Sequence, residues 1–156
     1  MGEQLVEYAL RQMCEDPETW YGELTDEERL EKVTVALEKG EDPNTSGGES
    51  EMTCLMVAVF FRRDQVVAKL LSCPGIKVNA KDKDNWTALH LAAWVGNVGI
   101  LKMLMATPGI LHNEKTESGQ TPIQLAAMRG QTDIVREMAR CPHVDLDLAI
   151  LPNFNR

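Results

Sequence analysis

Residues 86–113, WTALHLAAWVGNVGILKMLMATPGILHN, predict two short helices joined by a turn. Thr87 can start the first helix, expected over residues 88–95, because its hydroxyl can accept a hydrogen bond from a free backbone amide there. Gly96 can adopt the left-handed conformation that ends many helices. Apolar residues at helical spacing then predict a second helix over residues 98–106.

The same pattern recurs at an interval of 34 residues on either side of this stretch. One related segment, MTCLMVAVFFRRDQVVAKLLSCPGIKVN, begins at Met52, and another, QTPIQLAAMRGQTDIVREMARCPHVDLD, begins at Gln120. Similar residues fall in register, namely Thr53, Thr87 and Thr121, then Pro74, Pro108 and Pro142, and finally Leu70, Leu104 and Met138. One helix pair cannot bury its apolar face alone, so we expect several pairs to stack around a shared core.

Three short motifs indicate which family this repeat resembles. Residues 85–93, NWTALHLAA, and residues 119–127, GQTPIQLAA, are similar to the GxTPLHLAA signature of the ankyrin family. Residues 78–80, VNA, resemble the segment that leads into the β-hairpin of that family. The resemblance covers at least residues 44–147. It implies an all-α ankyrin-repeat solenoid of about four stacked helix-turn-helix units with short β-hairpin fingers.

The resemblance also implies how a single domain over residues 1–156 divides into units. We expect a degenerate capping repeat over residues 1–44, repeats over 45–79, 80–113 and 114–147, and a C-terminal tail over 148–156. In the first unit, TDEE at Thr25 predicts a capping-box start for a helix that ends near residue 39. Residues 1–24 include an amphipathic stretch, which either closes the stack as a cap or forms a separate docking helix for a partner.

Two positions depart from the family pattern where that pattern uses glycine. Arg62 takes the place of the glycine after the first helix of its unit. Either Arg62 adopts a strained left-handed conformation, or the turn differs locally. Asn85 replaces the glycine of a finger, where asparagine is tolerated because it enters that conformation easily.

The composition limits the class of partner. A net charge of -8 and a pI of about 4.9 disfavour nucleic acid and favour a protein partner with a basic patch. Four cysteines without paired spacing predict reduced thiols in the cytoplasm or nucleus, and we expect a monomer. The N-terminus carries neither a Sec-type signal nor a long apolar run, so we expect no membrane insertion. The alternative location is that of a secreted effector acting inside a host cell.

We expect no catalytic site, no cofactor and no metal ion. The family resemblance gives His90 a structural role, a hydrogen bond between neighbouring turns. Cys141 and His143 provide only two ligands, whereas tetrahedral zinc requires four that converge. The sequence has neither a glycine-rich phosphate loop after a strand nor a nucleophile motif.

The candidate binding residues are side chains that the core does not require. In the ankyrin family such positions lie on finger tips and on the exposed ends of inner helices, which line one concave face. Here they are Met52, Phe60, Phe61, Lys81, Lys83, Asp84, Trp86, Trp94, Val95, Gln120, Met128 and Arg129. The pairs beginning at Phe60, Trp94 and Met128 recur at 34-residue steps and predict an apolar, aromatic stripe, which usually marks an interaction site. Alternatively, Phe60 and Trp94 fill gaps between adjacent inner helices.

These observations predict a protein–protein interaction module. It would be an adaptor, scaffold or targeting domain that binds a partner protein or peptide through the concave face and the finger tips. One alternative is an inhibitory or regulatory subunit that masks a basic segment of its partner. Others are a non-catalytic part of a larger enzyme and a fragment of a longer repeat array. The family also contains substrates of an asparaginyl hydroxylase, and Asn79 and Asn113 occupy the modified position.

Overall fold

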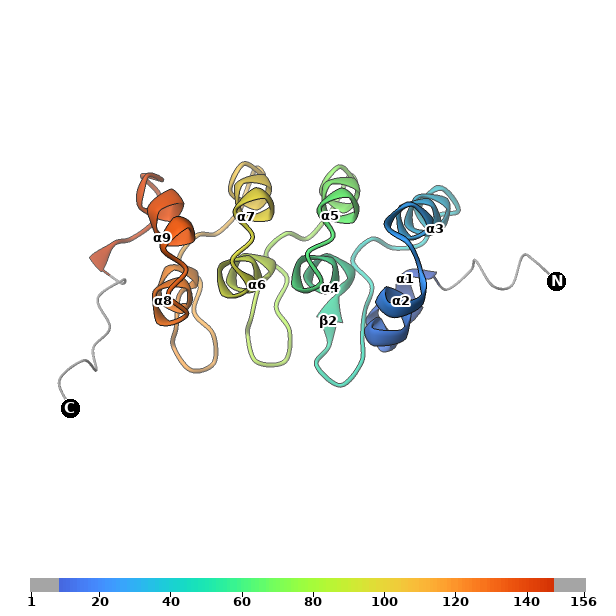
Figure 1. Ribbon diagram of the computed structural model, residues 1–156, viewed down its shortest axis with the longest axis horizontal. Helices are drawn as coiled ribbons and strands as arrows, with labels where there is room; N and C mark the ends of the chain where they lie inside the picture. The colour runs from blue at the N-terminus through green and yellow to red at the C-terminus, as the bar shows by residue number, and fades with distance from the viewer. Residues whose placement is uncertain (1–8, 148–156) are drawn as a thin grey trace.

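The computed structural model describes residues 9–147, which form nine α-helices and one small antiparallel sheet (Figure 1). In chain order the elements are α1 (Ala9–Glu15), α2 (Pro17–Glu23), α3 (Asp26–Glu38), β1 (Ser46–Gly47), β2 (Met52–Thr53), α4 (Cys54–Phe60), α5 (Asp64–Leu71), α6 (Ala88–Val95), α7 (Val98–Met105), α8 (Pro122–Met128) and α9 (Thr132–Ala139). The outer helices α3, α5, α7 and α9 form the upper row in Figure 1, and α4, α6 and α8 lie beneath them. Each helix packs against its neighbour in the same row, so the predicted all-α repeat solenoid is confirmed.

The first unit differs from the expected helix pair because it contains three helices. α1 packs against both α3 and α4, so it occupies the place of an inner helix, and α2 packs against α1. Leu10 and Met13 of α1 are completely buried, as are most of Trp20 and Tyr21 of α2. Residues 9–24 therefore pack on the N-terminal end of the stack, and their role as a cap, like the division of the chain into repeats, stays a prediction. The rest of that segment, residues 1–8, and the tail predicted over residues 148–156 lie outside the described residues.

The helix boundaries follow the sequence signals. The hydroxyl of Thr87 accepts a hydrogen bond from the amide of His90 at 3.4 Å, and Gly96 ends α6 with a φ of 74°. α6 spans the predicted residues, and α7 ends one residue before the predicted boundary at residue 106. Thr25 forms the predicted capping box at the start of α3.

Left-handed backbone occurs at Arg62 and Asn85, the two positions expected to replace a family glycine, and also at Glu51, which has a φ of 56°. Arg62 has a φ of 57° and Asn85 a φ of 61°. Of the two alternatives for Arg62, the strained conformation is therefore the correct one, at a cost of roughly 1 kcal/mol relative to glycine. The family glycine is retained at Gly96 and Gly130, both of which have positive φ.

The fingers differ from the predicted β-hairpins. Among the described residues, only the first finger has strand geometry, where β1 pairs with β2. The next two fingers are turns, closed by backbone hydrogen bonds from Asp82 to Trp86 and from Thr116 to Gln120, each 3.0 Å. The tips are nevertheless joined from finger to finger through their backbones, which fixes the spacing of the side chains that they carry.

A repeated asparagine ties each unit to the next. The Asn79 side chain donates to the carbonyl of Gly109 at 2.7 Å and accepts from the amide of Leu111 at 2.9 Å. Asn44 and Asn113 bind the following loops in the same two-sided way. Because both ends of each side-chain amide are used, these residues set the spacing between units. Hydroxylation of Asn79 or Asn113 stays a prediction.

Two buried thiols lie where α1 meets α4. The Sγ atoms of Cys14 and Cys54 are 3.1 Å apart, and both cysteines are free and buried. A hydrogen bond with Cys14 and burial raise the pKa of Cys54 far above its usual range. Cys73 and Cys141, the other two cysteines, are only partly buried.

This difference predicts an order of thiol modification. We expect iodoacetamide at about pH 8 to label Cys73 and Cys141 in the folded protein well before Cys14 and Cys54, because alkylation requires an accessible thiolate. Peptide mass spectrometry at successive times measures the order, and in concentrated urea all four should react at similar rates. Rapid labelling of Cys54 without denaturant would contradict the closed packing of α1 on α4.

Candidate functional site

The candidate surface begins at the turns that follow the inner helices. Residues 60–63, 94–97 and 128–131 comprise the end of an inner helix and the turn to the outer helix in three successive units. Phe60 is 46% exposed and Met128 51% exposed, whereas the equivalent Trp94 is half-buried. We define the stripe as the residues Phe60, Phe61, Trp86, Trp94, Met128 and Arg129.

Residues at the base of two fingers complete this surface. The rings of Trp86 and Trp94 meet edge to face, with centroids 5.6 Å apart. In the next unit, the Gln120 side chain contacts the sulfur of Met128 at 3.5 Å. The same two repeat positions therefore touch in both units. Trp86 is only partly exposed, since it packs against the core.

Side chains also link one turn of the stripe to the next. The guanidinium of Arg129 lies over the Trp94 ring, 4.3 Å from its centroid, in cation–π geometry. Arg62 donates a hydrogen bond to the carbonyl of Val95, and Gln131 donates to the carbonyl of Trp94 at 3.3 Å. The turn at residues 94–97 is thus held from both neighbouring units.

Phe61 is less available to contact a partner than its place in the sequence pattern suggests. Its ring stacks on Tyr21 of α2, with centroids 4.4 Å apart and planes 15° from parallel. Burial raises the pKa of the Tyr21 phenol, which is consistent with its position beneath Phe61. The gap-filling role is the alternative expected for Phe60 and Trp94, whereas it is Phe61 that packs against α2 and Phe60 that stays exposed. Tyr21 lies outside the 34-residue repeat, so no register position could identify it.

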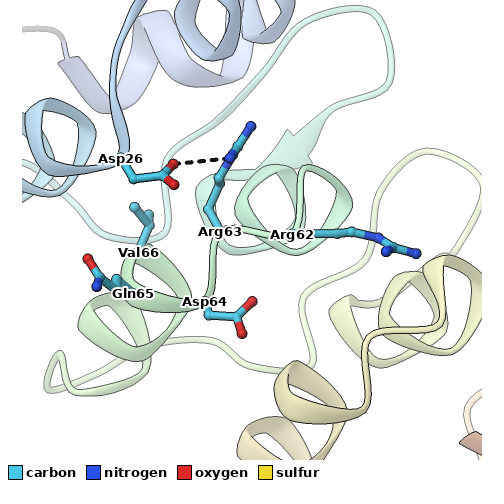
Figure 2. A pocket seen from close by; sticks show the side chains of 6 residues that line it. All are labelled: Asp26, Arg62, Arg63, Asp64, Gln65 and Val66. Carbon is cyan, nitrogen blue, oxygen red and sulfur yellow. Dashed lines mark hydrogen bonds and ion pairs between the residues drawn. The ribbon is translucent and has the colours of Figure 1, made fainter.

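A pocket of about 310 Å³ opens beside the stripe, between α3 and the start of α5 (Figure 2). Its lining residues are Asp26, Arg62, Arg63, Asp64, Gln65 and Val66. Arg63 extends toward Asp26, with which it forms an ion pair of 3.0 Å, and Arg62 extends the opposite way, toward the next unit. Both signs of charge line the pocket, so it has no strong preference for an ion.

The finger tips present mixed charges. Lys81 pairs with Glu114 of the following finger at 2.5 Å, whereas Lys83 and Asp84 are exposed. The amide of Lys83 donates to the carbonyl of Ser50, and that of Glu117 donates to the carbonyl of Asp84. Met52 in the first finger is only partly exposed and packs against the core. The predicted tip residues therefore lie along one edge of the solenoid, and they are mostly charged, whereas the stripe is mostly apolar.

The three histidines contact other parts of the repeats. Burial lowers the pKa of His90, whose Nε2 lies 3.0 Å from the carbonyl of Glu114 and 3.2 Å from that of Gln120, as the predicted bridge between turns requires. His112 and His143 are neighbours, with ring centroids 5.7 Å apart. Within residues 9–147, no group of three or more His, Cys, Asp or Glu side chains is arranged to hold a metal ion. In the same part of the chain, no helix has the length and apolar character to cross a membrane.

Comparisons with known proteins agree with the repeat architecture. The family model described as "Ankyrin repeats (3 copies)" matches residues 25–116, and the model described as "Ankyrin repeat" matches residues 118–149. No curated protein matches the chain. Both matches leave out α1 and α2, the two helices that precede the first recognisable repeat.

Proposed function

Because this chain belongs to the ankyrin-repeat family, whose repeats are generally protein–protein interaction modules, we propose that it binds a partner protein or peptide through the stripe and the adjoining finger tips. The observation that carries the proposal is the alignment of large apolar side chains over three successive turns, with Phe60 and Met128 exposed and Trp94 half-buried. Phe60 is 46% exposed and Met128 is 51% exposed. Apolar groups left in water cost about 25 cal/mol per Å² relative to burial, so their retention favours a binding role.

The residue types of the stripe also support this proposal. Tryptophan and arginine are the side chains that most often dominate the binding energy of protein interfaces. Trp94 carries Arg129 across its face, and Gln131 holds its backbone, so the ring is fixed before a partner arrives. A rigid aromatic side chain loses little conformational entropy on binding. We therefore propose Trp94 as the centre of the interface and an adaptor or targeting role for the domain.

Truncation of the exposed stripe should separate binding from folding. We expect the double variant Phe60→Ala/Met128→Ala to lose about tenfold or more in affinity for partners captured by the wild-type chain, because each side chain contributes an exposed apolar anchor. Quantitative capture from cell lysate, followed by titration of the purified partner, measures this loss. Phe61 is left unchanged because its stack on Tyr21 would mix binding with the stability of the cap.

The chain offers a matched control for this experiment. Leu111 is 50% exposed and Leu146 48% exposed, close to the values for Phe60 and Met128, and both lie outside the stripe. The variant Leu111→Ala/Leu146→Ala removes similar apolar groups and should leave affinity unchanged. Equal losses for both double variants, or a loss with the control alone, would contradict the proposed surface.

A further inference from the structure

The negative charge of the chain is unevenly distributed. Residues 1–51 contain 15 of the 24 acidic residues and four of the 16 basic ones, a net charge of -11. The remaining residues, 52–156, hold nine acidic and twelve basic residues and therefore carry a net charge of +3. The overall value of -8 thus describes the capping unit and the first finger, not the repeats that carry most of the stripe.

The turns that carry the stripe are also richer in basic than in acidic residues. Residues 60–63, 94–97 and 128–131 include Arg62, Arg63 and Arg129 but no acidic residue. Arg63 forms an ion pair with Asp26, a carboxylate that it shares with Arg29. Within the described part of the chain, neither Arg62 nor Arg129 forms an ion pair, and both are exposed. Two uncompensated cations therefore remain on the apolar surface.

These two cations flank the central turn of the stripe. Arg62 reaches from the preceding unit to the carbonyl of Val95, and it points away from Asp26 (Figure 2). Arg129 reaches back from the following unit over the Trp94 ring. Each guanidinium has several N–H groups, so one hydrogen bond to a carbonyl leaves others free to bind a carboxylate. The nearest aspartate on α5, Asp64, already accepts a hydrogen bond from Asn97 at 3.0 Å.

We propose that the stripe binds an acidic peptide segment, in which apolar side chains pack on Phe60, Trp94 and Met128 while Asp or Glu carboxylates meet Arg62 and Arg129. This inference rests on the proposed function and reverses the preference for a basic partner that the net charge suggests. An arginine bound to a carboxylate forms charge-assisted hydrogen bonds, which fix the peptide's register along the stripe. The acidic capping unit would repel such a peptide, which favours binding over α6 and α8.

Random peptides provide a probe that requires no known partner. Displayed peptides of roughly 12 residues span ~40 Å when extended, enough to cross several turns. Selection on the full wild-type chain should enrich sequences with net negative charge and at least one aromatic or large aliphatic residue. Affinities of synthetic versions are then measured by fluorescence anisotropy for wild type, Trp94→Ala and Arg62→Gly/Arg129→Gln. Arg62→Gly also suits the left-handed backbone at this position.

We expect the double arginine variant to bind the selected peptides about tenfold or more weakly, in line with the loss of two charge-assisted contacts. The control Arg140→Gln/Lys102→Gln removes the same charge from the outer helices, where both residues pair with Glu137, and should leave affinity unchanged. Selected peptides that require Trp94 but are neutral or basic would overturn the acidic preference and leave the proposed function standing. If no enriched peptide depends on Trp94, both proposals are contradicted.

Discussion

Replacement of His90 by alanine should lower the free energy of unfolding by about 3 kcal/mol, since a buried side chain with bonds at both ring nitrogens is lost. The Nδ1 atom accepts from the amide of Thr87 at 3.1 Å, so the proton of the neutral ring lies on Nε2, which donates to the carbonyls of Glu114 and Gln120. Alanine removes the partner of the buried Thr87 amide and the bond to the Glu114 carbonyl. The Gln120 carbonyl keeps its bond from the Thr116 amide. Urea denaturation followed by circular dichroism measures the change.

The equivalent position one unit later supplies the control. Gln124 occupies it, and its side-chain oxygen accepts from the amide of Thr121 at 2.9 Å. His90→Gln should therefore keep the bond that starts α6 and lose only the bridge to the next finger, at a cost of about 1–2 kcal/mol. If His90→Ala and His90→Gln were equally destabilising, the bonds to Thr87 would contribute nothing.

The same histidine makes stability depend on pH. Burial lowers the pKa of His90 below its ordinary value of 6.5, so the folded chain holds the ring neutral while the unfolded chain can protonate it. This contribution to stability is complete above about pH 6.5 and is lost as the pH falls toward the folded-state pKa. When the free energy of unfolding is measured at several pH values, it should fall less steeply with decreasing pH in His90→Gln than in the wild type. Part of the pH dependence of stability should remain in this variant, because burial also lowers the pKa of His112.

The sequence was sufficient to predict the repeat because the fold is local. Each unit depends on signals a few residues apart, such as Thr87 at the start of α6 and Gly96 at its end, and these recur at a fixed interval. The left-handed conformation of Arg62 is one of two alternatives that the sequence leaves open, and the structure decides between them. The three-helix first unit could not be predicted in this way, since α2 has no counterpart in the other units and α1, which takes the place of an inner helix, lies outside the 34-residue pattern.

The candidate site was less accessible to sequence analysis, because exposure depends on contacts between units. Register placed Phe60 and Phe61 together, but only the packing of α2 distinguishes the exposed ring from the one stacked on Tyr21. The preference for a basic partner rests on net charge and stays a prediction, and a sum over the chain does not show where the charges lie. The cationic character of the stripe becomes visible only when Arg63 is paired with Asp26 and Arg62 is left unpaired.

Arg29→Met should have the second large effect, a loss of about 3 kcal/mol centred on the capping unit. Arg29 is 5% exposed, pairs with Asp26 at 2.7 Å and donates to the carbonyls of Trp20 and Tyr21. Its guanidinium also lies 5.3 Å from the centroid of the Tyr21 ring. One cation thus fastens the end of α2 to α3, and methionine fills similar volume without making any of these bonds.

Hydrogen exchange should show that the loss is local, because a repeat protein is stabilised mainly by contacts between neighbouring units. In Arg29→Met, amides of α1 and α2 should exchange faster while those of α6 to α9 keep their protection. Lys32→Met is the control, since Lys32 is exposed on the same helix and its loss should change neither stability nor exchange. Uniformly faster exchange along the chain would instead mean that the cap and the repeats unfold as one unit. Binding at Trp94 should survive the local change, because α6 is held by α4 and α8 rather than by the cap.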